Sequence, residues 1–321
     1  MHSFEELSAV FSGKFSERHF PNEPSSLYNS TEYFLGLGGK RIRPVLCLMA
    51  NELFDEIHAD AWQVATAIEL FHNFTLIHDD IMDRAPLRRG METLHQKFGE
   101  STALLAGDVM LVKAYDYLNN IQSSHLKNII HLFNKTATEV CEGQQLDMDF
   151  EKKKVVSLND YLRMIELKTS ALLAASLKMG SIIGGTTIRN QNLLYEFGKK
   201  LGNAFQVQDD YLDAFGDPKK FGKQTGGDIR SNKKTFLLIH ALETCTAAQK
   251  KELLHQLKTN AEDKTEKVLS IFRDCKVDEW ALYLKNKFLD EALSHLDEIA
   301  VVEKRKEPLQ AVTHFLVQRD Y

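Results

Sequence analysis

Two short acidic motifs hold the residues of this chain that are best suited to chemistry. Both read Asp-Asp-x-x-Asp, at residues 79–83 and 209–213, inside segments with the composition of buried helices. On a helix the three carboxylates of such a motif lie within an arc of about 100°. This concentration of negative charge in an apolar setting is unfavourable unless cations neutralise it. Because Mg²⁺ binds carboxylate oxygens together with substrate phosphates, the motifs predict a magnesium–phosphate site with the ligands Asp79, Asp80, Asp83, Asp209, Asp210 and Asp213.

Cationic residues accompany both motifs, as the binding of a phosphate would require. Arg88 and Arg89 follow the first motif, and a run rich in glycine and lysine follows the second at residues 216–235. The spacing of this run differs from that of a P-loop, which we therefore exclude. Upstream, Lys40 and Arg43 are three residues apart in a segment that we predict to begin a helix, so they would share a face. Such a helix N-terminus is a candidate diphosphate site, and a solvated charged cap is the alternative.

Two further positions stand out because of their setting. His72 lies about 20° from Asp79 on an ideal helix, two turns upstream, so it should face the same space. Lys168 and Thr169 lie in an otherwise apolar helical segment that begins at Tyr161. A lysine in such a segment either binds an anion or extends its amine to the surface, and the sequence leaves both interpretations open. An acidic motif alone also fits a solvated helix face, but the apolar neighbours of the first motif favour the rim of a pocket.

The composition argues against several classes of protein. The chain has 321 residues, a net charge of −5 and 43% hydrophobic residues, which allows a large core and gives no support to a nucleic-acid binder. The 4 cysteines are scattered without a Cys-x-x-Cys pair, so we expect reduced thiols and a cytoplasmic protein. The N-terminus does not resemble a signal peptide, and no apolar run is long enough to span a membrane.

The hydrophobic pattern is helical almost throughout. Glycine and proline separate the helical segments, strand-like alternation is nearly absent, and no linker divides the chain. We therefore predict a single all-α domain, residues 1–321, with ten or more helices, of which the central ones are apolar on all sides. The predicted helical segments are 61–77, 101–118, 129–146, 161–179, 191–212, 235–242, 247–257, 266–272 and 279–302.

The order of the motifs resembles that of the trans-isoprenyl diphosphate synthases, the polyprenyl synthetase family. The resemblance covers about residues 38–235 and is carried by GGKRIRP, LIHDDIMDRAPLRRG, AGDVML, EGQQLD, ELKTSAL, FQVQDDYLD and GKQTGGDI. It implies an isoprenoid-synthase-type helical bundle around a central apolar cavity, usually in a homodimer. The implied activity is the Mg²⁺-dependent 1′-4 condensation of isopentenyl diphosphate with an allylic diphosphate to give an all-trans product.

The resemblance also assigns roles to residues by their position in the motifs. Asp79 and Asp83 would bind two Mg²⁺ ions, and Asp209, assisted by Asp213, would bind a third. Lys168, Thr169 and Gln206 would line the reacting centre. The allylic diphosphate would be bound by Arg88, Lys168, Lys223 and Lys233, and isopentenyl diphosphate by Lys40, Arg43, His72 and Arg89. Three Mg²⁺ ions would balance the six carboxylates, and the basic residues would balance a bound diphosphate.

In this family the residues just before the first acidic motif limit the length of the product. Here Phe74 is the fifth residue upstream of Asp79, Thr75 is the fourth, and Phe71 lies one turn deeper. The pattern resembles short-chain synthases and implies a C15 to C20 product, with C20 (geranylgeranyl diphosphate) favoured over C15 (farnesyl diphosphate). The alternative is that these are ordinary core aromatics. Ideal helix angles place Thr75 and Phe71 nearer than Phe74 to the aspartates, a conflict that helix bending would have to resolve.

Three other functions are compatible with parts of the pattern. A class I terpene cyclase shares one Asp-Asp-x-x-Asp motif, but it normally has a mixed Asn/Ser/Glu signature in place of the second and no use for Lys40 and Arg43. A helical metal phosphohydrolase could use His78 and Asp79, but no other His-Asp pair occurs. A noncatalytic subunit of a heteromeric synthase tends to lose the acidic motifs, and both are intact here.

Overall fold

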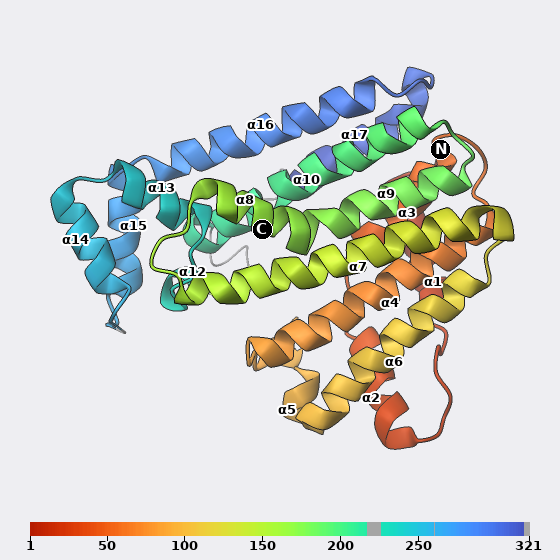
Figure 1. Ribbon diagram of the computed structural model, residues 1–321, viewed down its shortest axis with the longest axis horizontal. Helices are drawn as coiled ribbons and strands as arrows, with labels where there is room; N and C mark the ends of the chain where they lie inside the picture. The colour runs from red at the N-terminus through yellow and green to blue at the C-terminus, as the bar shows by residue number, and fades with distance from the viewer. Residues whose placement is uncertain (217–225, 260, 318–321) are drawn as a thin grey trace. The chain divides into compact units, whose positions relative to one another are not determined.

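A computed structural model of the chain describes residues 1–216, 226–259 and 261–317, and their regular secondary structure is almost entirely helical (Figure 1). The chain divides into two compact units. The first unit comprises Met1–Lys135, Ala175–Tyr195 and Ile299–Pro308, and the second comprises Thr136–Ala174, Glu196–Glu298 and Leu309–Tyr321.

The prediction of an all-α fold is confirmed. Within the described residues, the exception is one hairpin of two short antiparallel strands. The elements in chain order are α1 (Phe4–Phe15), α2 (Ser25–Leu35), α3 (Ile42–Glu52), α4 (Ala59–Met82), β1 (Leu87–Arg88), β2 (Met91–Glu92), α5 (Leu94–Phe98), α6 (Glu100–Asn119), α7 (Ser123–Lys152), α8 (Leu158–Ile165), the π-helix η1 (Glu166–Ser170), α9 (Ala171–Ile183), α10 (Ile188–Phe215), α12 (Gly227–Arg230), α13 (Phe236–Thr244), α14 (Ala247–Gln256), α15 (Lys264–Asp274), α16 (Val277–Asp297) and α17 (Glu303–Val317).

Two predicted segments differ from the structure. The segment 279–302 is wrong at its C-terminal end, because α16 ends at Asp297. The buried side chain of Ile299 extends the apolar pattern past the helix, but the Val301 amide donates to the Ile299 carbonyl in a turn. The segment 161–179 is not one regular α-helix, since η1 interrupts it between α8 and α9.

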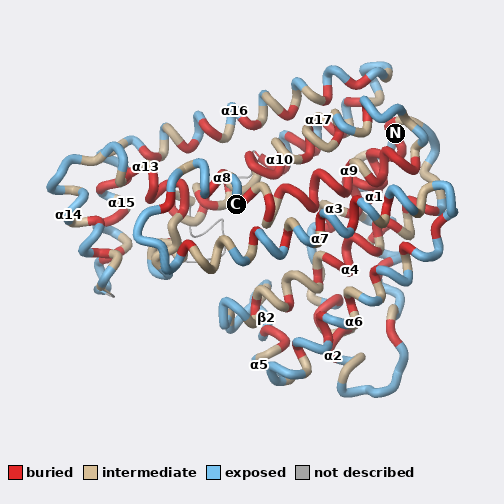
Figure 2. The backbone as a smooth tube through the Cα atoms, in the orientation of Figure 1, coloured by how far each residue is buried: buried red, intermediate tan, exposed pale blue. Residues whose placement is uncertain are grey.

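The core of the first unit contains a helix that is enclosed on all sides. Every residue of α3 from Pro44 onward is buried (Figure 2). Gly180 on α9 allows close packing here, because an added Cβ would overlap the Cys47 carbonyl oxygen of α3. The prediction of central helices that are apolar all round is therefore confirmed for α3. The neighbouring α4, which carries the first acidic motif, packs against α3 and α6.

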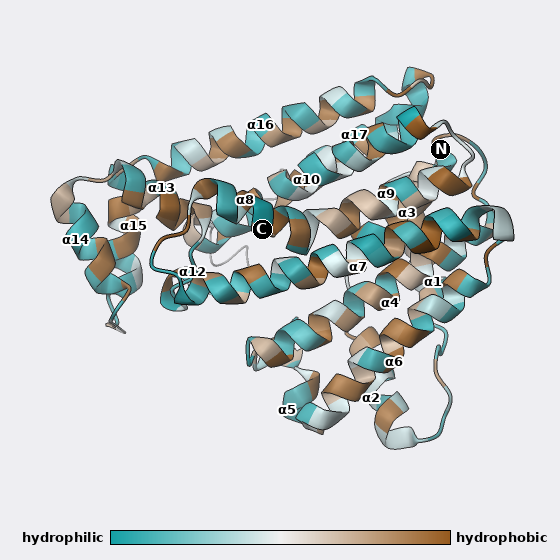
Figure 3. Ribbon diagram, in the orientation of Figure 1, coloured by the Kyte–Doolittle hydropathy of each residue, from teal (hydrophilic) through white to brown (hydrophobic). Residues whose placement is uncertain are grey.

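In the second unit, glycines allow two helices to approach η1 closely. An added Cβ at Gly143 on α7 would overlap the backbone of Lys168, and one at Gly202 on α10 would lie 2.6 Å from the Ser170 hydroxyl. Hydrophobic and hydrophilic residues alternate along α7, whereas α9, which continues from η1, is largely hydrophobic (Figure 3). The π-helix is thus packed closely against α7 at its middle and against α10 at its C-terminal end.

Candidate active site

Both acidic motifs lie at the C-terminal ends of long helices. The first occupies the last turn of α4, with Asp83 as the C-cap residue, and the second ends at Asp213, two residues before the end of α10. Unpaired carbonyl groups give a helix C-terminus a partial negative charge, which disfavours carboxylates there. Each motif is therefore placed where a bound cation would stabilise it.

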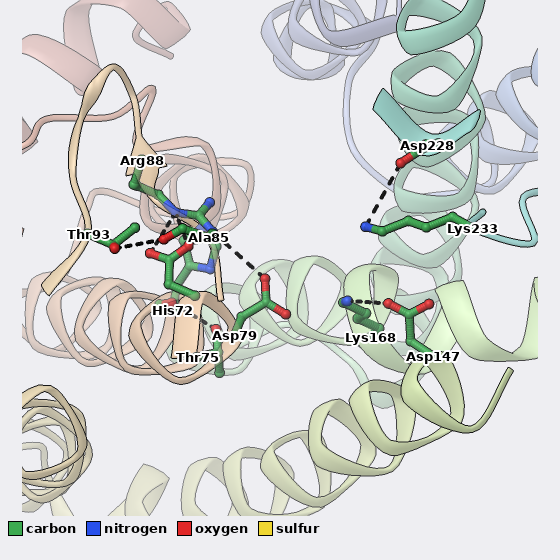
Figure 4. A network of polar contacts seen from close by, with 11 residues as sticks. His72, Thr75, Asp79, Ala85, Arg88, Thr93, Asp147, Lys168, Asp228 and Lys233 are labelled. Atoms are coloured by element: carbon green, nitrogen blue, oxygen red, sulfur yellow. Dashed lines mark hydrogen bonds and ion pairs between the residues drawn. The ribbon is translucent and has the colours of Figure 1, made fainter. Parts of the chain in front are cut away.

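The middle aspartate of the first motif is held by an arginine. Asp80 is buried and accepts hydrogen bonds from Arg88 Nε, at 3.0 Å to each carboxylate oxygen, and from Arg88 Nη2 at 2.6 Å. Burial raises the pKa of the Asp80 carboxyl, and the hydrogen-bonded ion pair with Arg88 opposes this rise. The same Nη2 atom lies 3.8 Å from Asp79 Oδ2 (Figure 4). Asp80 thus orients Arg88 beside Asp79.

The hairpin β1–β2 holds the backbone of Arg88 and Arg89 in a defined conformation. Strand pairing places Arg89 and Gly90 in a two-residue turn with φ angles of 54° and 79°. Positive φ at both positions is the type I′ pattern of tight hairpins. The base of the hairpin is closed by Thr93, whose buried hydroxyl donates to the Ala85 carbonyl at 2.7 Å (Figure 4). Arg88 lies in β1, directly before the turn.

All four residues assigned to isopentenyl diphosphate belong to the first unit, and Arg43, His72 and Arg89 lie close together there. Arg43 Nη1 on α3 lies 3.2 Å from His72 Nε2 on α4. Arginine has donors only, so Nε2 accepts and the neutral ring carries its proton on Nδ1. Burial lowers the pKa of His72 well below its usual value, and the charges of Arg43 and Arg89 lower it further. The Arg89 guanidinium lies on Gly39, where an added Cβ would be 2.9 Å from Nη2.

Lys40 does not share a helical face with Arg43, and that prediction is wrong. Helix α3 begins two residues after Lys40, and the loop before it has left-handed conformations at Gly38 and Arg41, with φ angles of 77° and 50°. Such conformations do not continue into a right-handed helix. The loop is anchored by the buried ion pair between Arg41 and Glu69, and Lys40 itself is exposed.

We expect acid to destabilise the first unit through His72. Its pKa is lowered on folding, so its contribution to stability is complete above the ordinary value of about 6.5 and is lost as the pH falls toward the lower folded pKa. The free energy of unfolding should fall by at most about 1.4 kcal/mol per pH unit in that window. Urea unfolding from pH ~7.5 to ~5 measures this slope, which His72→Gln should reduce and His131→Gln, at an exposed histidine of α7, should not. Equal slopes in wild type and His72→Gln would contradict the assignment.

Aromatic side chains line α4 upstream of the first motif. The Phe71 ring lies 5.6 Å from that of Phe74 and 5.2 Å from that of Phe133, and Tyr115 packs on Phe133 at 5.2 Å between centroids. Phe74 also packs edge-on against His78 at 4.7 Å. Phe71 is only 1% exposed, whereas Phe74 is half-buried. Phe71 is therefore a core residue, and Phe74 is the more accessible of the two.

In the second unit the middle aspartate is held in a comparable way by other groups. Asp210 is buried and accepts hydrogen bonds from the Tyr161 hydroxyl and from Gln206 Nε2, the latter at 2.9 Å. Gln206 Oε1 in turn accepts from the Thr169 hydroxyl at 3.1 Å. Burial raises the pKa of Asp210 to about 8, the charge of Asp228 adds to the rise, and both hydrogen bonds oppose it. This chain of hydrogen bonds fixes the orientation of the Gln206 amide.

Lys168 is bound to a carboxylate and lies in a rare type of helix. Its Nζ donates to Asp147 Oδ2 on α7 at 2.6 Å, and its side chain is 24% exposed (Figure 4). Lys168 and Thr169 both belong to η1, and π-helices frequently occur at functional sites. The Lys168 amine is therefore held by a carboxylate of the neighbouring helix α7 rather than extended into solvent.

A short segment connects the second motif to Lys233. Asp213 Oδ2 accepts from the Asp228 amide at 3.0 Å, and the Gly226 amide donates to the Asp213 carbonyl at 2.6 Å. Lys233 Nζ lies 3.9 Å from Asp228 Oδ1, and the Lys233 amide donates to the Asp228 carbonyl at 2.9 Å (Figure 4). Helix α12 thus links Asp213, an outer aspartate of the second motif, to Lys233, a candidate ligand of the diphosphate. Lys223 lies outside the described residues.

The carboxylates fit a metal ion that is shared with a phosphate. Within residues 1–216, 226–259 and 261–317, no three His, Cys, Asp or Glu side chains converge closely enough to hold a metal by themselves. Mg²⁺ usually takes only one or two carboxylates and completes its shell with water and substrate phosphates. The aspartates outside the middle position are the more accessible ones, namely Asp79, Asp83, Asp209 and Asp213. The accessibility of these four carboxylates suits Mg²⁺ that binds together with a diphosphate.

The sequence did not single out Asp147, Tyr161 or Asp228 as site residues. Tyr161 and Asp147 bind partners that are 49 and 21 residues away in the chain, so no local spacing rule connects them. The one available signal was that Asp147 and Asp228 lie inside the segments EGQQLD and GKQTGGDI, which carry the family resemblance.

Each described helix is too short or too polar to span a membrane.

Comparison with known proteins identifies the family. Residues 24–275 match the family model described as Polyprenyl synthetase. The chain is 36% identical to the geranylgeranyl diphosphate synthase of Methanosarcina mazei, over 93% of this chain and 91% of that protein. It is 33% identical to the geranylfarnesyl diphosphate synthase of Natronomonas pharaonis, over 95% of this chain and 94% of that protein.

The fold agrees with a solved structure over its full length. A crystal structure of a geranylgeranyl pyrophosphate synthase matches with a TM-score of 0.95 at 41% identity, and the match covers 99% of both chains. Together with the motifs and the family match over residues 24–275, this similarity leaves one assignment. The chain belongs to the polyprenyl synthetase family.

Proposed function

We propose that this protein catalyses the Mg²⁺-dependent 1′-4 condensation of isopentenyl diphosphate with allylic diphosphates, giving a short all-trans prenyl diphosphate. The observation that carries the proposal is the repeated arrangement of the two acidic motifs. In each, at the end of a helix, the middle aspartate is buried against protein partners and the outer aspartates are more accessible. This arrangement supports metal binding by the outer carboxylates, and the family membership supports the reaction.

In this proposal each acidic motif would hold Mg²⁺. The direct metal ligands are the outer aspartates, Asp79, Asp83, Asp209 and Asp213, with three Mg²⁺ ions per site. Asp80 and Asp210, which the sequence also suggested as ligands, act instead as positioning residues for Arg88 and for Gln206. Bound Mg²⁺ supplies the positive charge that stabilises a departing diphosphate.

The basic residues of the two units bind the diphosphate groups of the substrates. Arg88, Lys168 and Lys233 bind the allylic diphosphate, and each lies within ion-pair distance of a carboxylate that orients it. Lys223 completes this set. Isopentenyl diphosphate is bound by Lys40, Arg43, His72 and Arg89, and the Nδ1–H group of neutral His72 is the donor for it.

No side chain has to form a covalent bond with the substrate. As the allylic C–O bond breaks, Arg88, Lys168 and Lys233 stabilise the leaving diphosphate, and the allylic carbon becomes cationic. Thr169 and Gln206 line the reacting centre in this proposal, and the Gln206 amide keeps its orientation because its nitrogen donates to Asp210. Apolar surroundings suppress hydrolysis of the cation. The isopentenyl double bond attacks it, and the resulting tertiary cation loses a proton to the released diphosphate.

For the product we propose C20, with C15 as the alternative. Phe74 is only half-buried whereas Phe71 is a core residue, and this supports Phe74 as the side chain that limits the length of the product. The relatives named above include both geranylgeranyl and geranylfarnesyl synthases, so an assay has to decide. We further expect a homodimer in the cytoplasm.

The proposed function is tested with purified protein, labelled isopentenyl diphosphate and one of three primers, namely dimethylallyl, geranyl or farnesyl diphosphate. We expect elongated product with Mg²⁺, a loss of about a hundredfold or more with excess chelator, and recovery when Mg²⁺ is added back. Chromatography of the products gives their length. If no primer is elongated, the proposed function is wrong. A terpene cyclase would instead release a hydrocarbon from an allylic diphosphate alone.

A further inference from the structure

A buried lysine outside the motifs holds the loop that carries Lys233. Lys264, the first residue of α15, is 3% exposed. Its Nζ donates to Asn232 Oδ1 at 2.7 Å and to the Arg230 carbonyl at 3.4 Å. A buried ammonium group is unfavourable unless such acceptors compensate for the lost water. The lysine is thus committed to residues 230–232, which directly precede Lys233.

Helix α15 makes a second close contact with the same segment. At Gly226, directly before α12, an added Cβ would overlap the side chain of Thr265. Two adjacent residues of α15 therefore contact the two ends of α12. The space that Lys233 and Lys264 share with the neighbouring side chains is a cavity of only about 20 Å³. That volume admits about one water molecule, so α12 is closely supported on this side.

The segment that α15 supports, residues 226–233, contacts the proposed metal ligand Asp213 and contains the proposed diphosphate ligand Lys233. At one end, the Asp228 amide of α12 donates to Asp213 of the second acidic motif. At the other end, Asn232 has a φ angle of 60°, a left-handed turn that directs the chain into Lys233. Asparagine tolerates this conformation better than most residues, and its side chain is the acceptor for Lys264. The hydrogen bond therefore fixes the turn from which Lys233 extends.

We propose that Lys264 is a positioning residue for diphosphate binding, which it serves by fixing the Asn232 turn and with it Lys233 and α12. The inference rests on the proposed function, because that function assigns Lys233 and Asp213 to the diphosphate and its metal ions. Lys264 binds protein groups behind the loop rather than substrate. The alternative is that the same contacts only stabilise the fold. A positioning role predicts that loss of Lys264 changes the Kd of pyrophosphate and the KM of the allylic substrate, whereas a purely structural role predicts a change in stability alone.

The experiment compares Lys264→Met, Asn232→Gly, the double variant and Asn232→Asp. Methionine keeps the length of the side chain without its donors, and glycine keeps the left-handed turn without the acceptor. The probe is inorganic pyrophosphate in the presence of Mg²⁺, with its Kd measured by calorimetry and the KM of both substrates measured alongside. The control is Lys267→Met on the same helix, where an exposed lysine pairs with Asp263.

We expect both single variants to raise the pyrophosphate Kd and the allylic KM by about tenfold, with little change in the KM of isopentenyl diphosphate. The double variant should be no worse than either single one, because the two residues share one interaction. Asn232→Asp keeps an acceptor and should bind as wild type does, as should Lys267→Met. If Lys264→Met fails to fold, the pyrophosphate Kd of Asn232→Gly tests the same interaction.

Unchanged pyrophosphate affinity in the folded Lys264→Met and Asn232→Gly proteins overturns the inference, even if their melting temperatures are lower. Wild-type protein that binds no pyrophosphate with Mg²⁺ overturns it as well. Failure of the proposed function looks different, since wild-type protein would then elongate none of the primers. The calorimetric result does not depend on turnover, so the two failures are distinguishable.

Discussion

Replacing Asp79 with asparagine should lower kcat/KM by about a thousandfold, which corresponds to about 4 kcal/mol of transition-state stabilisation. The amide keeps the shape of the side chain but removes the charge that a hard cation such as Mg²⁺ requires. The free energy of unfolding should change little. Asp79 lies at the negative end of α4, so removing its charge is favourable there, and this gain offsets the loss of its 3.8 Å contact with Arg88. Steady-state kinetics and urea unfolding of the same protein provide both measurements.

Asp80→Asn is the matched control within the motif. It keeps the outer ligands but removes the buried charge that binds Arg88 through Nε and Nη2. Breaking a buried ion pair is costly, so the free energy of unfolding should fall by roughly 3 kcal/mol. The KM of the allylic substrate should rise more than kcat falls, since Arg88 would lose its orientation. If Asp79→Asn and Asp80→Asn show the same profile, the division of the motif into outer ligands and a middle positioning residue is wrong.

The main helices could be predicted from the sequence because their segments are long, apolar and separated by glycine or proline. The periodicity of residues 61–77 and 101–118 leads directly to α4 and α6, although α4 continues through the acidic motif to Met82. The π-helix η1 could not be predicted in this way. It depends on the close approach of α7 at Gly143 and of α10 at Gly202, which are contacts between distant parts of the sequence.

The candidate site was predictable in its chemistry but not in its division of roles. Helical spacing placed His72 on the same face as Asp79, and the structure brings it to Arg43. The same spacing puts all three aspartates of a motif on one arc, so it could not separate Asp80 and Asp210 from their neighbours. That separation comes from Arg88 on a hairpin and from Tyr161 on another helix. Both partners are fixed by tertiary structure, which a helical wheel does not contain.

Phe74→Ala should lengthen the product by at least one isoprene unit, from C20 to C25 or beyond. The Phe74 ring is half-buried and packs on Phe71 and His78, so truncation removes a bulky side chain from beside the first motif while the core ring behind it stays in place. Because the site is only partly buried, the stability loss should be smaller than the roughly 3 to 5 kcal/mol typical of a fully buried phenylalanine. Radiochromatography of the dephosphorylated products measures the length, and urea unfolding measures the stability.

Phe71→Ala separates a wall of the product cavity from an ordinary core aromatic. Phe71 is 1% exposed and contacts both Phe74 and Phe133, so its loss should destabilise the protein by about 3 to 5 kcal/mol. If Phe74 limits the chain, the folded fraction of Phe71→Ala keeps the wild-type product while Phe74→Ala does not. The reverse pattern would place the end of the product cavity one turn deeper, against Phe133 and Tyr115. Only there would removal of a ring lengthen the cavity. An unchanged product in both variants would show that neither ring bounds the growing chain.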